Sequence, residues 1–229
     1  EICACLVGSE MCIRDSFITH LRDEKGLRNS TIGKQLGFLK WFLKWSANNG
    51  YHKNMAYLSF KPKLKTTEKR IIYLTWDELM TVYNFPIPES KKYLDRVRDV
   101  FCFCCFTSLR YSDVYNLKRF DIKNGALHIT TVKTADSLTI DLNKYSQAIL
   151  DKYDGVPFED NKALPVISNQ KMNDYIKELG QLCGLDQPET VTYYVGNERV
   201  DEVYPKYELM GTHTCLLYTS PSPRDMRRS

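Results

Sequence analysis

The chain has 229 residues and a net charge of +4, and 43% of its residues are hydrophobic, an ordinary fraction for a globular protein. This length fits one large domain or two small ones. No run approaches the ~20 apolar residues of a membrane span, and the first 16 residues lack the basic start and apolar stretch of a signal peptide. We therefore expect a cytoplasmic protein with no membrane partner.

Charge is distributed unevenly along the chain. Residues 17–74 contain 12 Lys and Arg against 3 Asp and Glu, a net charge of +9, whereas residues 75–214 contain 16 against 21, a net charge of −5. A basic segment joined to a mildly acidic one is typical of a protein whose first part meets a polyanion such as nucleic acid. A well-solvated, lysine-rich face is the alternative.

The eight cysteines do not indicate a metal site. Cys102, Cys104 and Cys105 lie in an apolar run, where a free cysteine behaves as a small hydrophobe. No C-x-x-C pair occurs, and no Cys/His set has the spacing of a zinc site. We expect reduced thiols, no metal and no cofactor.

The two ends of the sequence do not read as native protein. Residues 1–16 contain C-L-V-G-S-E-M-C-I-R-D-S, and residues 215–229 read C-L-L-Y-T-S-P-S-P-R-D-M-R-R-S. Both strings are similar to translated sequencing-adapter sequence, and neither continues the periodicity of its neighbour. We interpret them as non-native, so that the authentic sequence covers about residues 17–214 and is truncated on both sides. A disordered tail is the alternative reading of the second string.

Residues 17–60 are expected to form helices. A short helix should end near Gly26, and a longer one should begin with a cap at Asn29-Ser30 and stop at Gly50. The longer helix carries two apolar stripes, Ile32, Leu36, Leu39 and Leu43 on one face and Phe38, Trp41 and Trp45 on nearly the opposite face. Such a helix packs on two sides. We expect the second partner to be a helix outside this sequence, and DNA is the alternative.

Residues 61–74 read as a basic linker between two domains. The candidate DNA-binding residues of the first part and the linker are lysines, which could equally face solvent. They are Lys40, Lys44, Lys61, Lys63 and Lys65.

Residues 75–214 are expected to form a second domain of helices with a small hairpin. The pattern T-x-x-E from Thr75 to Glu78 is a capping box that opens a helix, and Asn143 caps another. The expected helices cover residues 75–85, 91–109, 112–117, 143–153 and 169–183, and residues 207–210 are expected to form a short turn or helix. The expected strand pairs cover 126–142 and 191–203. The fold class is therefore mainly α with small β-hairpins, that is, α+β.

Three charged or titratable residues follow in order along this domain. Arg110 comes directly after the most hydrophobic run, in F-C-F-C-C-F-T-S-L-R-Y-S-D. Lys133 lies at the tip of the expected hairpin in T-T-V-K-T, and His213 lies in G-T-H-T.

In these motifs the sequence resembles the tyrosine recombinases, or phage-type integrases, and most of all those of mobile elements in Bacteroides-type bacteria. The box around Arg110 matches the family's first catalytic arginine, and Asp113 matches the acidic residue that braces the site. Lys133 matches the hairpin lysine, and His213 matches the start of the H-x-x-R box. The resemblance covers essentially all of residues 17–214. It implies a helical, SAM-like core-binding domain, partial here and covering 17–60, followed by a partial DNA breaking-rejoining catalytic domain over 75–214.

The residue types suit the chemistry that the resemblance implies. These enzymes attack a DNA phosphodiester with a tyrosine and leave a 3′-phosphotyrosyl link. A guanidinium at Arg110 would stabilise the extra negative charge of the transition state. Lys133 would protonate the leaving 5′-oxygen, and His213 would donate to a phosphate oxygen or help move the proton of the nucleophile. No metal is required.

Each assignment has a structural alternative. Arg110 could pair with Asp113 on a helix surface, Lys133 could be an exposed strand lysine, and His213 could be a loop histidine. His20, His52 and His128 are interpreted as structural.

The chain departs from the family pattern at its end. Leu216 stands where the second arginine is expected, and Tyr218 lies inside the foreign string, too close to His213 to be the nucleophile. We therefore expect this chain to be unable to cleave DNA, whereas its intact parent could. A covalent adduct on suicide DNA substrates would contradict this.

The partner implied is double-stranded DNA, on which the intact parent would assemble as a homotetramer while this fragment stays monomeric. Two other functions stay open: a non-catalytic DNA-binding module derived from a recombinase, and a type IB topoisomerase. An H-x-x-R box followed by a tyrosine, in the reading frame beyond His213, would restore the enzyme.

Overall fold

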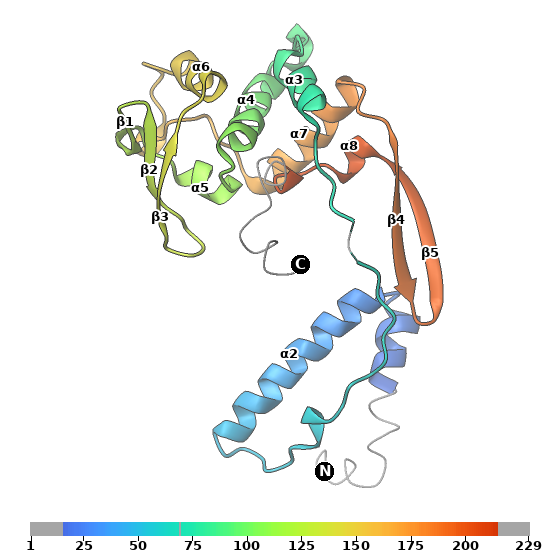
Figure 1. Cartoon of the computed structure of the whole chain (residues 1–229). Helices are drawn as coiled ribbons and strands as arrows, with labels where there is room; N and C mark the ends of the chain where they lie inside the picture. The colour runs from blue at the N-terminus through green and yellow to red at the C-terminus, as the bar shows by residue number, and fades with distance from the viewer. Residues whose placement is uncertain (1–15, 69, 215–229) are drawn as a thin grey trace. The chain divides into compact units, whose positions relative to one another are not determined.

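The computed structural model describes residues 16–68 and 70–214, which form two compact units (Figure 1). One unit contains the described residues up to Arg70 together with Thr190–Val203. The other contains Ile71–Glu189 and the described residues from Tyr204 to Thr214. A hairpin from late in the sequence therefore belongs to the N-terminal unit.

The N-terminal unit is built from helices and a long hairpin. α2 (Asn29–Asn48) follows a short π-helical segment (His20–Glu24) and precedes a single 3-10 turn (Ala56–Leu58). β4 (Pro188–Val195) and β5 (Glu198–Pro205) form the two-stranded hairpin that the sequence predicts around Gly196-Asn197.

Asn29 does not cap α2, contrary to prediction. The cap position is Arg28, and no side chain caps this helix end. The Asn29 amide instead donates to the carbonyl oxygens of Lys65 (2.8 Å) and Gly196 (2.7 Å) and accepts from the Gly196 N–H (2.8 Å). The Asn29 side chain thus bonds three backbone groups, one in the linker and two in the hairpin. As a helix cap it would bond only one or two backbone groups.

The two apolar stripes of α2 differ in burial. Ile32 and Leu36 are buried, as the first stripe predicts, although Leu39 is exposed. Phe38 and Trp41 are each 69% exposed, so the second stripe has no cover from the residues that the structure describes. The helix expected to cover this second stripe stays a prediction.

The second unit contains six helices and a small sheet within the described residues. The helices are α3 (Trp76–Asn84), α4 (Tyr93–Thr107), α5 (Tyr111–Asn116), α6 (Lys144–Lys152), α7 (Asn169–Leu182) and α8 (Lys206–Leu209). The strands are β1 (Ile122–Lys123), β2 (Ala126–Thr130) and β3 (Ser137–Asp141). Short 3-10 turns cover Glu89–Lys91, Arg119–Asp121 and Glu159–Asn161.

α4 lies in the hydrophobic core of this unit. Phe101 and Phe103 are fully buried, and so are the three cysteines of the same helix, which behave as the small hydrophobes that the sequence predicts. Because successive positions of its second half are buried whichever way they point, α4 is enclosed by its neighbours on all sides there.

The helix ends of the second unit follow local chemistry. Thr75 and Glu78 form the predicted capping box, and the Asn143 side chain accepts from two backbone N–H groups at the start of α6. α4 is shorter than the predicted range 91–109, because its last helical residue precedes Ser108, whose φ of 57° turns the chain into the left-handed region.

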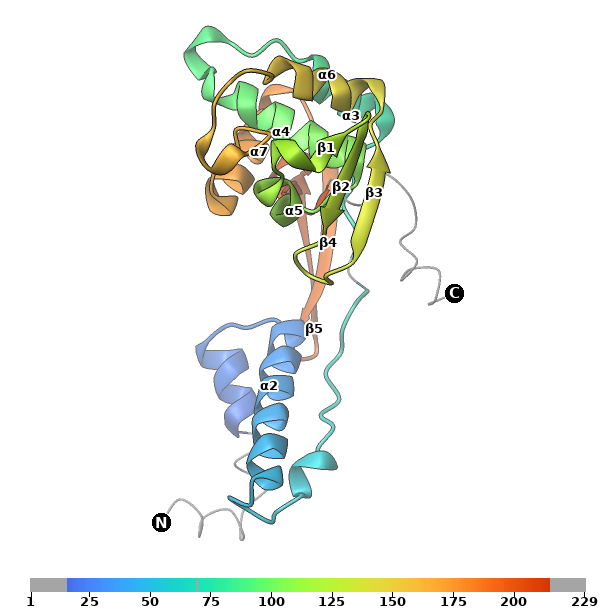
Figure 2. The ribbon, with the colours of Figure 1, turned by 90° about the vertical axis from the view of Figure 1, so that its left-hand side faces the viewer.

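The small sheet is antiparallel with the order β1-β2-β3 (Figure 2). Leu127 lies opposite Ile140, and Thr130 lies opposite Ser137, so the connecting turn covers residues 131–136. This is the hairpin that the sequence predicts, with one further short strand, and the α+β fold class is confirmed. Among the described residues, no helix combines the length and apolar character that crossing a membrane requires.

Candidate active site

Arg110 lies at the start of α5, directly after the buried core helix. Its backbone is extended (φ −67°, ψ 149°), and its carbonyl accepts from the N–H groups of Asp113 (2.9 Å) and Val114 (3.1 Å). Leu109 is buried, whereas Arg110 is half-buried. The left-handed turn at Ser108 therefore brings the guanidinium-bearing residue out of the core at a fixed position.

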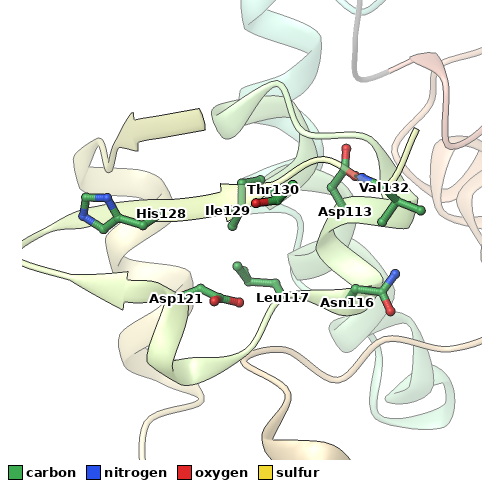
Figure 3. A pocket seen from close by; sticks show the side chains of 8 residues that line it. All are labelled: Asp113, Asn116, Leu117, Asp121, His128, Ile129, Thr130 and Val132. Atoms are coloured by element: carbon green, nitrogen blue, oxygen red, sulfur yellow. Dashed lines mark hydrogen bonds between the residues drawn. The ribbon is translucent and has the colours of Figure 1, made fainter. Parts of the chain in front are cut away.

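Asp113 connects α5 to the hairpin turn that carries Lys133. The Asp113 side chain is 5% exposed, and its Oδ1 accepts from the backbone N–H of Val132 (2.9 Å), which Figure 3 places beside it. Asp113 therefore braces the hairpin. Within the described part of the chain its carboxylate forms no ion pair with Arg110, which was the alternative for these two residues. Lys133 follows Val132 and is exposed in the turn.

The turn itself is closed by threonine. Thr131 Oγ1 lies 2.8 Å from Thr134 Oγ1, and the Asp136 N–H donates to Thr131 Oγ1 (3.2 Å). Ala135 lies in the left-handed region with φ 55°. These contacts fix the backbone on both sides of Lys133 and leave its side chain in solvent.

His213 lies in a short turn that α7 holds. Thr212 donates its N–H to Asn173 Oδ1 (2.9 Å), and Thr212 Oγ1 lies 3.3 Å from Asn169 Oδ1. The preceding helix α8 is anchored by the Lys206 ammonium, which lies 2.6 and 2.7 Å from the two Glu78 carboxylate oxygens. Thr212 and Thr214 are buried, and His213 between them is exposed.

Hydrogen bonds link the three segments to one another. Tyr111, next to Arg110, donates its hydroxyl to the carbonyl of Ile167, two residues before α7 begins. Asn169 and Asn173 of α7 contact the residue before His213, and Asp113 contacts the residue before Lys133. Each of the three predicted residues is thus one position away from a contact that leads to α5 or α7. That their side chains share one phosphate stays a prediction.

Burial sets the protonation of the linking phenol. Tyr111 is 9% exposed, and this burial raises its pKa to about 12. The hydroxyl is therefore neutral and remains a donor to Ile167 at physiological pH.

A cavity of about 280 Å³ lies behind the hairpin turn, between α5 and β2 (Figure 3). Its lining residues are Asp113, Asn116, Leu117, Asp121, His128, Ile129, Thr130 and Val132. Asp121 accepts from the Lys118 N–H (2.9 Å), and His128 Nδ1 lies 3.2 Å from Thr139 Oγ1. The cavity borders the brace between Asp113 and Val132, and sequence patterns gave no indication of it.

The predicted DNA-binding lysines differ in their surroundings. Lys40 is half-buried and donates to the Phe60 carbonyl, so its ammonium is already engaged. The Lys65 ammonium lies 5.9 Å from the centre of the Tyr194 ring. Lys44, Lys61 and Lys63 are exposed. Their role in binding stays a prediction.

Two positions discussed in the sequence analysis, Leu216 and Tyr218, fall outside the described residues. Within the part of the chain that is described, no group of three or more His, Cys, Asp or Glu side chains is arranged to hold a metal ion. Tyr111, Asn169 and Asn173 were missed, because the sequence around a polar residue in a helix does not show which distant segment that residue contacts.

The fold is similar to those of solved integrase structures. A lambda integrase fragment, described as a dimer bound to a COC′ core site, matches with a TM-score of 0.61 at 15% identity, over 94% of this chain and 78% of that chain. A lambda integrase tetramer bound to a Holliday junction matches with a TM-score of 0.61 at 16% identity, over 92% of this chain and 60% of that chain. The Tn1549 transposon integrase in complex with circular intermediate DNA matches with a TM-score of 0.52 at 14% identity, over 93% and 74%.

The chain has the tyrosine recombinase fold. The resemblance that the sequence motifs indicate is confirmed at this level, whereas the relation to Bacteroides-type elements stays a prediction. No sequence-family model and no curated protein matches the chain. The tyrosine recombinase fold here spans three fifths of the longer lambda chain, so the activity of a whole recombinase is a matter of proposal.

Proposed function

We propose that this chain is a fragment of a site-specific DNA recombinase, an integrase that cuts and rejoins DNA through a 3′-phosphotyrosine intermediate. The observation that carries the proposal is the set of contacts linking the segments of Arg110, Lys133 and His213 within a tyrosine recombinase fold. The structural neighbours are themselves described as bound to DNA, which supports double-stranded DNA as the partner.

In the proposed reaction, a tyrosine of the intact parent attacks the phosphorus, and the bond to the 5′-oxygen breaks. Arg110 would hold two non-bridging oxygens through the paired donors of its planar guanidinium. The Lys133 ammonium would give its proton to the departing 5′-oxygen. His213 would donate to a phosphate oxygen or take up the proton that the attacking tyrosine hydroxyl loses. Rejoining would reverse these steps.

The biological setting is also part of the proposal. We infer a role in DNA integration for a mobile element, in the cytoplasm, with a homotetramer as the active form of the intact parent and a monomer for this fragment. Without the second arginine and the nucleophile, this chain would bind DNA but not cleave it. A non-catalytic DNA-binding module is the alternative, and a covalent adduct formed by the parent would exclude it.

Hydrogen exchange tests whether the three segments meet one partner. Deuterium uptake of the full chain is measured with and without a DNA duplex at low ionic strength. We expect peptides covering residues 108–113, 130–136 and 211–214 to become protected together. Lys133→Ala should weaken DNA binding, whereas Lys123→Ala, the matched change of an exposed lysine on β1 of the same sheet, should not.

Protection of only one of the three segments under saturating DNA would contradict a shared phosphate site. Equal binding by the Lys133 and Lys123 variants would contradict the role of Lys133.

A further inference from the structure

Asn173 occupies a fixed position between α7 and the turn that carries His213. It is half-buried on the second turn of α7. Its Nδ2 donates to the Asn169 carbonyl (2.9 Å), and its Oδ1 accepts from the Thr212 N–H (2.9 Å). Because a backbone N–H can only donate, the side-chain oxygen must face Thr212, and both ends of the amide have their required partner.

The contact between the two segments is also sterically tight. A Cβ atom added to Gly211 would lie 2.8 Å from Asn173 Oδ1, and one added to Gly180 would lie 2.9 Å from Met210 Sδ and from Tyr207 Cβ. Real side chains essentially never approach so closely. Glycine at these two positions therefore lets residues 207–212 lie directly against α7.

The turn after Gly211 is closed on itself. The Gly211 N–H donates to Thr214 Oγ1 (3.0 Å), and the Thr214 N–H donates to the Gly211 carbonyl (2.9 Å). His213 thus lies between two buried threonines, and the first of them, Thr212, is hydrogen-bonded to Asn173. Since His213 itself is exposed, its position relative to α7 depends on this backbone anchor and not on burial of its own ring.

We propose that Asn173 is a positioning residue for His213, holding the turn so that the imidazole meets the DNA phosphate. This rests on the proposed function, because it assumes that His213 faces DNA. A reactive group must be held within a small tolerance to act, and one oriented hydrogen bond from a rigid helix supplies that restraint at the backbone next to the imidazole.

The test follows the imidazole signals by NMR. The chain contains four histidines, His20, His52, His128 and His213, so their ring carbon-bound protons can be assigned by substitution. In the wild type, a saturating DNA duplex should displace the His213 signal. In Asn173→Leu, which removes the acceptor at similar size, that displacement should be lost, while the His128 signal stays as in the wild type.

Two variants serve as controls. Asn173→Asp keeps an oxygen acceptor for the Thr212 N–H and should restore the displacement. Gln170→Leu removes an exposed amide from the same helix, one that bonds the Asp174 carboxylate, and should leave the displacement unchanged. If Asn173→Leu does not fold, Gly211→Ala tests the same contact from the turn, since its new Cβ would push against Asn173 Oδ1.

The outcomes separate the two ideas. Loss in Asn173→Leu or Gly211→Ala with recovery in Asn173→Asp supports the proposal. An unchanged His213 displacement in both Asn173→Leu and Gly211→Ala overturns it and leaves the proposed function intact. A His213 signal that does not respond in wild-type chain fully bound to DNA overturns the assigned role of His213, and the positioning role with it.

Discussion

At the scale of single residues, Tyr111 links the helix of Arg110 to α7, and its ionisation gives this link a pH dependence. Its pKa is raised by burial from the ordinary value of 10 to about 12. Because the folded state favours the protonated phenol, the stabilisation is complete below pH 10 and is lost as the pH rises from 10 to 12. Two pKa units correspond to a loss of about 2.7 kcal/mol at most.

Tyr111→Phe isolates this contribution. At pH 7 the variant should be less stable by about 1 kcal/mol, because the hydrogen bond to the Ile167 carbonyl is gone. At pH 11 to 12 the difference should shrink or reverse, because phenylalanine has no proton to lose. Urea unfolding at both pH values measures this, with Tyr51→Phe, a change at a highly exposed tyrosine, as the control. A stability difference that does not change with pH would contradict the burial of the Tyr111 hydroxyl.

At the scale of elements, the β4–β5 hairpin belongs to the N-terminal unit through Asn29. Asn29 is 1% exposed and satisfies both backbone groups of Gly196. Beside it, the Arg28 guanidinium lies 3.6 Å from the centre of the Tyr193 ring and 3.3 Å from Glu202. The hairpin tip is thus held by one buried amide and a partly exposed charged cluster.

Asn29→Ala should release the hairpin tip. Leaving buried backbone groups unpaired costs about 1–3 kcal/mol each, so we expect faster hydrogen exchange in residues 193–199 and in α2. Exchange in α4, in the other unit, should stay slow. Asn49→Ala removes an exposed amide that bonds the Trp45 carbonyl at the other end of α2, and should leave exchange in residues 193–199 unchanged. Unchanged exchange of the hairpin tip in Asn29→Ala would show that other contacts hold it.

The same elements show what a sequence can and cannot predict. The capping box at Thr75, the cap at Asn143 and both hairpins were predictable, because the residues that form them are neighbours in the chain. Asn29 was misread as a cap, because its partner Gly196 lies 167 positions away and leaves no periodic pattern. Local motifs predicted Arg110, Lys133 and His213. The hydrogen bonds that join their segments connect residues far apart in the chain, so no local pattern predicted them.

At the scale of the whole molecule, the distribution of charge is the property most relevant to a DNA partner. The basic residues 17–74 and the net acidic residues 75–214 differ in sign, although Lys133 and Arg110 belong to the acidic part. Nonspecific attraction should therefore come from the first part, and the second part should contribute mainly through its local site. This division can be measured through the salt dependence of binding.

We expect the logarithm of the DNA association constant to fall linearly with the logarithm of salt concentration, with a slope of about −0.9 for each phosphate neutralised. Lys44, Lys61 and Lys63 are exposed, so changing all three to alanine should reduce the slope by about 2 to 3. Lys40 is left out because its ammonium bonds the Phe60 carbonyl. The matched control changes Lys123, Lys171 and Lys177, which are exposed in the second unit, and removes the same charge. Fluorescence anisotropy over a salt series gives both slopes. If the two triple variants lose equal amounts, the attraction reflects net charge alone, and the basic first part is not the contact surface.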